Sequence, residues 1–316
     1  MKKPDYIKYG YYAVKGRIRK KYIGIYGEDK YYESKRRYAG GYVLPLEETS
    51  QFLSDSIKRG RPFFAGRFGA NELNAVAVFD NRIEKKYQKI MTDMCNGAGF
   101  FPEEKEALIE FKNLMINSMG GLDYLAIWNL NMEDYYIRKY APKIVMSRLR
   151  YFEPWYADHP WTKALEGKKV LVIHPFEETI RSQYQRRDYL FEKRYILPEF
   201  TLYTQKAVQT IAGCKDYRFE TWFDALDYMY QEAMKTDFEV ALIGCGAYGF
   251  PLAAKIKEGG RQAIHLGGAL QLLFGIKGAR WDSNPVVSSM YNEYWVRASE
   301  SERPQNFTAV ESGCYW

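Results

Sequence analysis

The chain of 316 residues has few of the side chains that most often build metal centres and covalent cross-links. Its three histidines, His159, His174 and His265, lack the His-x-x-x-His spacing that is typical of metal ligands on a helix. The four cysteines form no Cys-x-x-Cys pair and lie far apart, at Cys95, Cys214, Cys245 and Cys314. We therefore expect neither a structural zinc site nor a disulfide framework.

Long apolar runs are scarce as well. No segment reaches the roughly 18 uninterrupted apolar residues of a membrane-spanning helix, and the N-terminal stretch has no apolar core of the kind found in signal peptides. Hydrophobic residues still make up 47% of the chain and charged residues 27%, which is typical of a globular protein with a buried core. We expect a cytoplasmic protein, either free or peripheral at the inner face of the plasma membrane.

The charge of the chain is concentrated at its start. Residues 1–40 carry 12 Lys and Arg against 4 Asp and Glu, a net +8, whereas the whole chain carries +7 (46 − 39). Ten tyrosines lie between Tyr6 and Tyr42. Basic and aromatic side chains together suit an anionic membrane surface. A solvated arm that packs some aromatics on the body is an alternative interpretation, and nucleic acid is the least favoured partner.

After Gly40-Gly41, short apolar runs alternate with amphipathic segments. The runs predict strands at 62–68, 124–128, 170–173, 200–204, 238–243 and 262–266. Helices are expected at 46–57 (capped by Thr49 or Ser50), 72–79, 103–119, 161–166, 177–190, 222–234 and 249–257. This alternation predicts an α/β fold with a Rossmann-like, mostly parallel sheet and helices on both faces. We expect a basic, Tyr-rich N-terminal extension (1–42), one Rossmann-like domain (43–285) with a subdivision near 150–165 left open, and a C-terminal extension (286–316).

A glycine-rich loop, Gly244-Cys-Gly246-Ala-Tyr248-Gly249, lies between a predicted strand and a predicted helix. Such a loop lets the backbone approach a phosphate at a helix N-terminus. A dinucleotide site would also need an acid at the end of the next strand, and residues 262–268 offer none. We therefore predict a phosphate-binding loop for a nucleotide or nucleotide-sugar diphosphate. A nucleotide-dependent oxidoreductase and a tight turn without a ligand remain alternatives.

Further candidates stand near other strand ends. His265, Gly267 and Gly268 repeat the strand-to-glycine pattern, and strand C-termini are where open α/β sheets bind ligands. Beyond them, Lys277 and Arg280 can clamp a diphosphate, and Trp281 can stack on a base or sugar. The alternative that these three side chains have ordinary surface or core roles has equal weight.

Two more candidates concern proton transfer and charge. His174 follows an apolar strand, and its side chain suits proton transfer at neutral pH. Arg67-Phe68-Gly69-Ala70-Asn71-Glu72 marks another strand-to-helix junction, where Arg67 can bind a phosphate through two hydrogen bonds. Glu72 can bind a metal, a sugar hydroxyl or Arg67.

The motif Arg67-Phe68-Gly69-x-x-Glu72, with the strand–loop–helix–strand unit at 241–267, resembles the GT-D-type glycosyltransferases over roughly residues 45–285. These bacterial enzymes have a Rossmann-like domain and transfer a sugar from a nucleotide donor during glycan assembly. The glycine loop and the stretches at 174–176 and 291–297 also look like those of bacterial proteins found with surface-polysaccharide genes.

The resemblance implies a donor, most simply a UDP-sugar, lying across Gly69, Gly244 and His265, and a glycan or lipid-linked acceptor. His174 is our first choice as general base and Glu72 the second. The family's Asp-x-Glu holds Mn²⁺ or Mg²⁺, but here it reads Ala70-Asn71-Glu72, so Glu72 would hold a metal without the Asp. The alternative is that the cations of Arg67, Lys277 or Arg280 replace the metal's charge. A non-catalytic nucleotide- or nucleic-acid-binding module is the remaining alternative.

Overall fold

The computed structural model describes residues 4–35, 37–304, 306–309 and 313–316. Its main feature is a nine-stranded sheet of order β1-β2-β5-β4-β3-β9-β8-β6-β7. Neighbouring strands run parallel except β1 and β2, which are antiparallel. The strands are β1 (Arg37–Tyr38), β2 (Gly41–Leu44), β3 (Phe63–Gly66), β4 (Tyr124–Ile127), β5 (Val145–Arg148), β6 (Lys169–His174), β7 (Thr201–Lys206), β8 (Val240–Ile243) and β9 (Gln262–His265). The predicted α/β fold with a mostly parallel sheet is confirmed.

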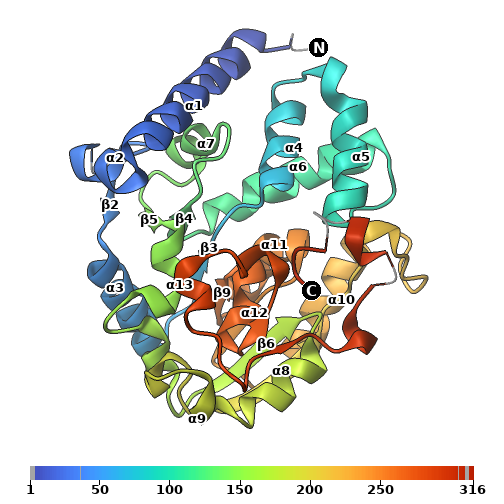
Figure 1. Cartoon of the computed structure of the whole chain (residues 1–316). Coiled ribbons are helices and arrows are strands. Elements are labelled where there is room, and N and C mark those ends of the chain that lie inside the picture. Colours follow the sequence, from blue (N-terminus) through green and yellow to red (C-terminus); the bar gives the residue numbers. More distant parts are fainter. Residues whose placement is uncertain (1–3, 36, 305, 310–312) are drawn as a thin grey trace.

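Helices surround the sheet (Figure 1). The longer ones are α1 (Tyr6–Tyr26), α2 (Glu28–Lys35), α3 (Leu46–Arg59), α4 (Ala70–Asp80), α5 (Tyr87–Ala98), α6 (Lys105–Gly120), α7 (Glu133–Tyr140), α8 (Glu177–Tyr184), α10 (Trp222–Met234) and α11 (Gly249–Glu258). Three helices have a single turn: α9 (Arg187–Leu190), α12 (Leu270–Leu273) and α13 (Pro285–Ser288). A separate parallel pair, β10 (Ile276–Lys277) and β11 (Val296–Arg297), joins the last part of the chain to the body.

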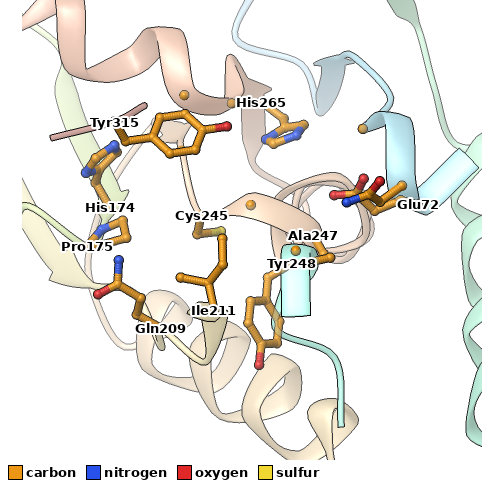
Figure 2. A pocket seen from close by; sticks show the side chains of 18 of the residues that line it. Glu72, His174, Pro175, Gln209, Ile211, Cys245, Ala247, Tyr248, His265 and Tyr315 are labelled. Atoms are coloured by element: carbon orange, nitrogen blue, oxygen red, sulfur yellow. The ribbon is translucent and has the colours of Figure 1, made fainter. Parts of the chain in front are cut away.

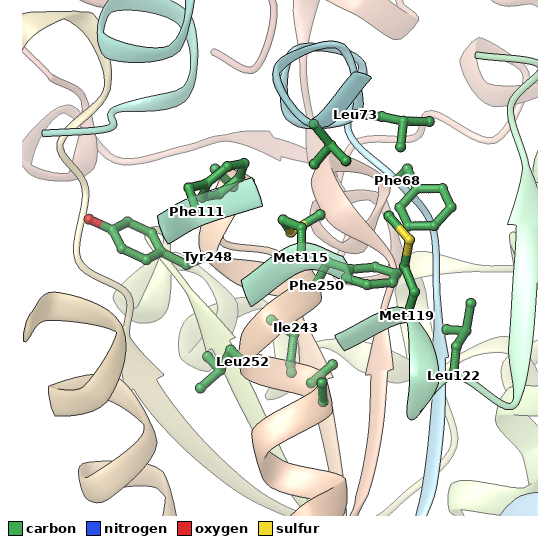
Figure 3. Close-up of a cluster of buried hydrophobic side chains, with 14 of the residues drawn as sticks. Phe68, Leu73, Phe111, Met115, Met119, Leu122, Ile243, Tyr248, Phe250 and Leu252 are labelled. Carbon is green, nitrogen blue, oxygen red and sulfur yellow. The ribbon is translucent and has the colours of Figure 1, made fainter. Parts of the chain in front are cut away.

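The sheet is buried on both faces, as the continuous apolar strands require. In β8, Ala241 and Ile243 belong to one hydrophobic core, whereas Val240 and Leu242 belong to a second core. The first core includes side chains of α4, α6 and α11, and Figure 3 shows them packed together. The second includes side chains of α3, α8 and α12. The alternation along one strand therefore places helical layers on opposite faces.

Several local expectations need correction. The first predicted helix begins after Pro45, so neither Thr49 nor Ser50 caps it, and both are buried within α3. The predicted helix at 177–190 is divided into α8 and α9, and that at 161–166 is a short 3₁₀ helix, Trp161–Leu165. The helices α1, α2, α5, α7 and α13 and the strands β1, β2, β5, β10 and β11 were not predicted. Strand β5 ends in Ser147 and Arg148, so it shows no apolar run, although both side chains are buried.

The N-terminal segment packs closely on the body. Arg19 of α1 is buried and donates to Asp134 (3.0 Å) and to the Tyr38 hydroxyl (3.0 Å). Tyr38 in turn donates to the buried Glu133 carboxylate (2.7 Å). Strand β2 contains the predicted boundary at residue 42 and pairs with β5. A deletion of residues 1–40 would remove these buried partners, so the body cannot be expected to stay intact without them.

The last part of the chain also packs against the domain, through Glu302. The buried Glu302 carboxylate accepts hydrogen bonds from the backbone N–H of Glu178 (2.7 Å) and of Thr179 (3.3 Å) at the start of α8. A carboxylate at this place satisfies free helical N–H groups and complements the helix dipole. No helix in the described part of the chain is long and apolar enough to span a membrane.

Candidate functional site

A pocket lies at the C-terminal edge of the parallel strands. The first half of the sheet (β2–β5) and the second half (β6–β9) meet where β3 pairs with β9. The loops after β3, β4, β6, β8 and β9 line the pocket, and residues of the 313–316 segment close one side (Figure 2). Open α/β sheets bind ligands at such a reversal of strand order, because the loops on either side diverge and leave a crevice.

Most of the predicted site residues meet in this pocket. Those that line it are Arg67, Gly69, Asn71, Glu72, His174, Gly244, Gly246, Tyr248, His265, Gly267, Gly268 and Arg280. Gly249, Lys277 and Trp281 are not among the lining residues. The Lys277 ammonium lies 5.2 Å from the ring centroid of Tyr291, and Trp281 is buried.

The glycine loop makes room for the two histidines. A Cβ atom at Gly244 would lie 2.6 Å from the ring of His174, and one at Gly249 would lie 2.1 Å from the ring of His265. Gly246, with φ of 58°, has no atom within 4 Å of such a position. Two of the three glycines therefore serve histidine packing, and only Gly246 leaves its backbone open to a ligand.

His174 is held as a neutral ring. Its Nδ1 accepts a hydrogen bond from the backbone N–H of Phe176 (3.0 Å), so the neutral ring carries its proton on Nε2. Burial lowers the pKa of His174 to about 3. An imidazole with this pKa is a poor proton acceptor at neutral pH, whereas its Nε2–H can donate to a ligand oxygen. The geometry thus disfavours His174 as the general base.

His265 has the opposite tautomer. Its Nδ1 lies 3.3 Å from the carbonyl oxygen of Ile243, which only accepts, so the proton sits on Nδ1 and Nε2 keeps its lone pair. Burial, and secondarily the charge of Arg67, lower the pKa of His265 to about 3. The pocket therefore contains one imidazole that can donate through Nε2 and one that can accept.

Arg67 lines the pocket together with a second arginine, Arg280. Its guanidinium lies 4.3 Å from the ring centroid of Trp128, and it covers Gly267, where an added Cβ would be 3.4 Å from its Nη1. Burial lowers its pKa, although Glu72 and Glu153 act in the opposite direction. A guanidinium stacked on an indole is fixed in orientation, and its remaining N–H groups can bind an anion such as a phosphate.

Glu72 stands in the first turn of α4. Its carboxylate folds back over Gly69, where a Cβ would approach Oε2 to 1.9 Å, so any larger residue at 69 would displace it. Burial raises the pKa of Glu72, while the helix N-terminus and Arg67 oppose the rise. An acid in this position normally serves only as a helix-dipole partner. Its raised pKa and its place in the pocket also suit a general base.

The resemblance implies a metal site beside Glu72. In the described ranges, no group of three or more His, Cys, Asp or Glu side chains is placed to hold a metal ion. The charged side chain that acts on Glu72 is a cation, Arg67, rather than a second carboxylate. The described residues therefore do not form an all-protein site for Mn²⁺ or Mg²⁺.

Two of the predicted site residues, Tyr248 and Asn71, make contacts that mainly serve the packing of the fold. Tyr248 is buried and stacks on Trp222, with ring centroids 4.6 Å apart and planes 5° apart. Its hydroxyl lies 3.1 Å from that of Thr210, and burial raises its pKa. Asn71 is exposed at the pocket edge, where its amide lies 2.8 Å from the place of a Cβ on Gly97.

Three residues near the site were missed in the sequence. Trp128 follows β4 and supports Arg67. Burial raises the pKa of Glu153 to about 8, with Arg67 opposing the rise. The Tyr315 ring rests on Gly268, lies 4.7 Å from the Arg280 guanidinium and, in Figure 2, points its hydroxyl toward His265. In the sequence, the Gly267-Gly268 pair indicates that some group lies close to the backbone there. It does not show that this group is the Tyr315 ring.

No family model and no curated protein matches the chain. A selenomethionine-substituted structure of the domain of unknown function 1792 is similar with 14% identity and a TM-score of 0.39, over 72% of this chain and 78% of that one. A second structure, described as the highly conserved domain of unknown function 1792 with a distinct glycosyltransferase fold, has 14% identity and a TM-score of 0.40, over 82% and 92%.

Proposed function

We propose that this chain is a glycosyltransferase that transfers a sugar from a nucleoside-diphosphate donor to a hydroxyl acceptor. The observation that carries the proposal is the meeting of Arg67, Glu72 and the open backbone of Gly246 in one pocket. Helices α4 and α11 both begin beside this pocket, so their N-terminal N–H groups favour an anion there. These features suit a diphosphate and a base on the same side of the sheet.

Each side chain has a defined role in the proposed reaction. The acceptor oxygen attacks the anomeric carbon, its proton passes to the Glu72 carboxylate, and the bond from that carbon to the phosphate oxygen breaks. The Arg67 guanidinium binds the departing diphosphate, whose negative charge grows as the bond breaks. The Nε2–H of His174 donates to an oxygen of the donor. Glu72 takes the place of His174 as base, because the Nδ1 of His174 already accepts from Phe176.

The leaving diphosphate is stabilised by fixed cations in this proposal. Arg67 and Arg280 both line the pocket, whereas Lys277 lies outside the lining. Transfer should therefore survive removal of divalent cations with EDTA. Complete loss with EDTA and recovery with Mn²⁺ would contradict this part of the proposal.

The finer identity of the reaction follows from the resemblance in the sequence. We propose a UDP-type donor, a glycan or lipid-linked acceptor, and a place in bacterial surface-polysaccharide assembly on the cytoplasmic side of the membrane. An oxidoreductase is less well supported, because His265 occupies the end of β9 where a ribose-binding acid would stand. Nicotinamide or flavin absorbance in the purified protein would revive that alternative.

The first experiment is a donor screen. UDP-, GDP-, dTDP- and CMP-sugars are added to the full chain, and thermal shift and donor hydrolysis are measured with and without EDTA. One of the three diphosphate classes should raise the melting temperature and be hydrolysed slowly without an acceptor, whereas the CMP-sugars, which carry a single phosphate, should do neither. A flat result for every donor would refute the proposed function.

The second experiment separates binding from chemistry. Glu72→Gln should keep donor binding and lower the hydrolysis rate by about 10²–10⁴-fold, the usual worth of a general base. Glu110→Gln, at an exposed position on α6, is the matched control and should behave as the wild type. Full activity of Glu72→Gln would remove Glu72 from the site.

A further inference from the structure

Helix α1 has an apolar stripe on the side that faces away from the body. The stripe consists of Ile7, Tyr11, Val14, Ile18 and Ile25, which recur at intervals of three, four or seven residues and so share one helix face. All five are exposed: Ile7 by 88%, Ile18 by 65% and Ile25 by 61%. A surface helix normally turns such a stripe toward the core, so α1 has an inverted arrangement.

The orientation of α1 is fixed by the contacts of its opposite face. Arg19 is buried against Asp134, and Lys15 pairs with the same carboxylate. The ring of Tyr12 lies 5.3 Å from that of Tyr135 on α7. These ionic and aromatic contacts hold α1 at the rim of the molecule (Figure 1), and they leave the stripe exposed.

Cations border the stripe. Arg17 and Lys21 are exposed along one side of it, and Lys20 is exposed further round the helix on the same side. The 21 residues of α1 include no acid, and the helix is about 31 Å long at 1.5 Å per residue. Tyr6 and Tyr26, both exposed, stand at its two ends, where interfacial aromatics are usually found. Two copies of this face would repel each other, whereas an anionic lipid surface complements its charge.

We propose that α1 is an interfacial membrane anchor that inserts its outward stripe among the headgroups of anionic lipids while lying parallel to the membrane. Apolar side chains buried beside the acyl chains and cations at the headgroups together give the affinity. The inference does not depend on the proposed function, although it would bring the pocket close to a lipid-linked acceptor.

The test is co-sedimentation of the full chain with vesicles. Phosphatidylcholine vesicles that contain about one-third phosphatidylglycerol should bind the protein, and pure phosphatidylcholine vesicles should bind it at least tenfold more weakly. The variant Ile7→Ser/Ile18→Ser should bind about 100-fold more weakly, since each buried isoleucine contributes on the order of tenfold. Tyr217→Ser replaces another highly exposed apolar residue and should bind as the wild type.

Three results would overturn the proposal. The first is no binding to either vesicle, and the second is binding that is unchanged in Ile7→Ser/Ile18→Ser. The third is a dimer in sedimentation that this double variant dissociates, which would assign the stripe to a second copy of the chain. Circular dichroism and the melting temperature of each variant verify the fold, and both should match the wild type because the substituted side chains are exposed. No donor enters these measurements, so a failure here is distinct from a failure of the proposed function.

Discussion

Replacing His174 tests whether the pocket holds its histidines neutral. Burial lowers the pKa of His174 from 6.5 to about 3. Below about pH 6.5, His174 therefore binds a proton in the unfolded chain but not in the folded chain. The free energy of unfolding must fall as the pH drops from 6.5 toward 3, by at most about 1.4 kcal/mol per pH unit. Between pH 7.5 and pH 5 the loss from this one ring is about 2 kcal/mol.

The variant His174→Asn isolates that contribution. The amide oxygen of asparagine can still accept from the backbone N–H of Phe176, but the side chain does not titrate. Urea unfolding at pH 7.5 and pH 5 should show about 2 kcal/mol less acid destabilisation in the variant than in the wild type. His159→Asn, at an exposed position, is the matched control and should keep the wild-type difference.

The variant must be compared with the wild type because buried carboxyl groups change the free energy of unfolding with pH in the direction opposite to His174. Burial raises the pKa of Glu153 to about 8 and that of Glu133 to about 7, so both carboxyls stabilise the fold as the pH falls. NMR gives a second measure, since the chain has only three histidines to assign. An unchanged pH dependence in His174→Asn, or a His174 resonance that titrates near pH 6.5, would refute the reasoning and restore His174 as a candidate base.

Other predictions concern packing and charge in and near the pocket. Arg67→Lys keeps a cation but loses the planar fork and the indole stacking, so donor affinity in calorimetry should fall about 10²-fold, while Arg186→Lys on the exposed surface should change nothing; equal affinities would remove the guanidinium from the site. Gly249→Ala should push the His265 ring out of place and lower the melting temperature by several degrees, and an unchanged crystal position of that ring would contradict the steric argument. Asp134→Ala leaves the buried guanidinium of α1 without its ion pair and should cost roughly 3–5 kcal/mol in urea unfolding; a loss below about 1 kcal/mol would mean that α1 is only loosely attached.

The sequence located the pocket because the signals there are local. A strand followed by a glycine and a helix can be recognised from one short segment of the sequence. β8, Gly246 and α11 lie where that pattern predicts them. Arg67 and Glu72 were found in the same way, at the junction of β3 and α4. The parallel sheet then brings these separate junctions to one edge.

The missed features depend on contacts between distant residues. Trp128 supports Arg67 from 61 positions away (128 − 67), and no spacing rule connects them. The sequence could not show the tautomer of His174, because only the fold shows that the backbone N–H of Phe176 donates to its Nδ1 and that the ring is buried. Helix α1 was not predicted, since its outward apolar stripe and its inward ionic contacts reverse the usual pattern.

The packing of histidine rings on the glycine loop limits how related sequences can vary. The positions of Gly244 and His174 form one steric unit, and those of Gly249 and His265 form another. A chain with alanine in place of Gly249 would need a smaller side chain in place of His265, so that pair should change together in evolution. At Gly244 the backbone oxygen of Gly267, 2.9 Å from an added Cβ, excludes alanine whatever side chain stands at position 174. Co-variation at the Gly249–His265 pair would therefore distinguish loops built around imidazoles from glycine loops that bind a dinucleotide.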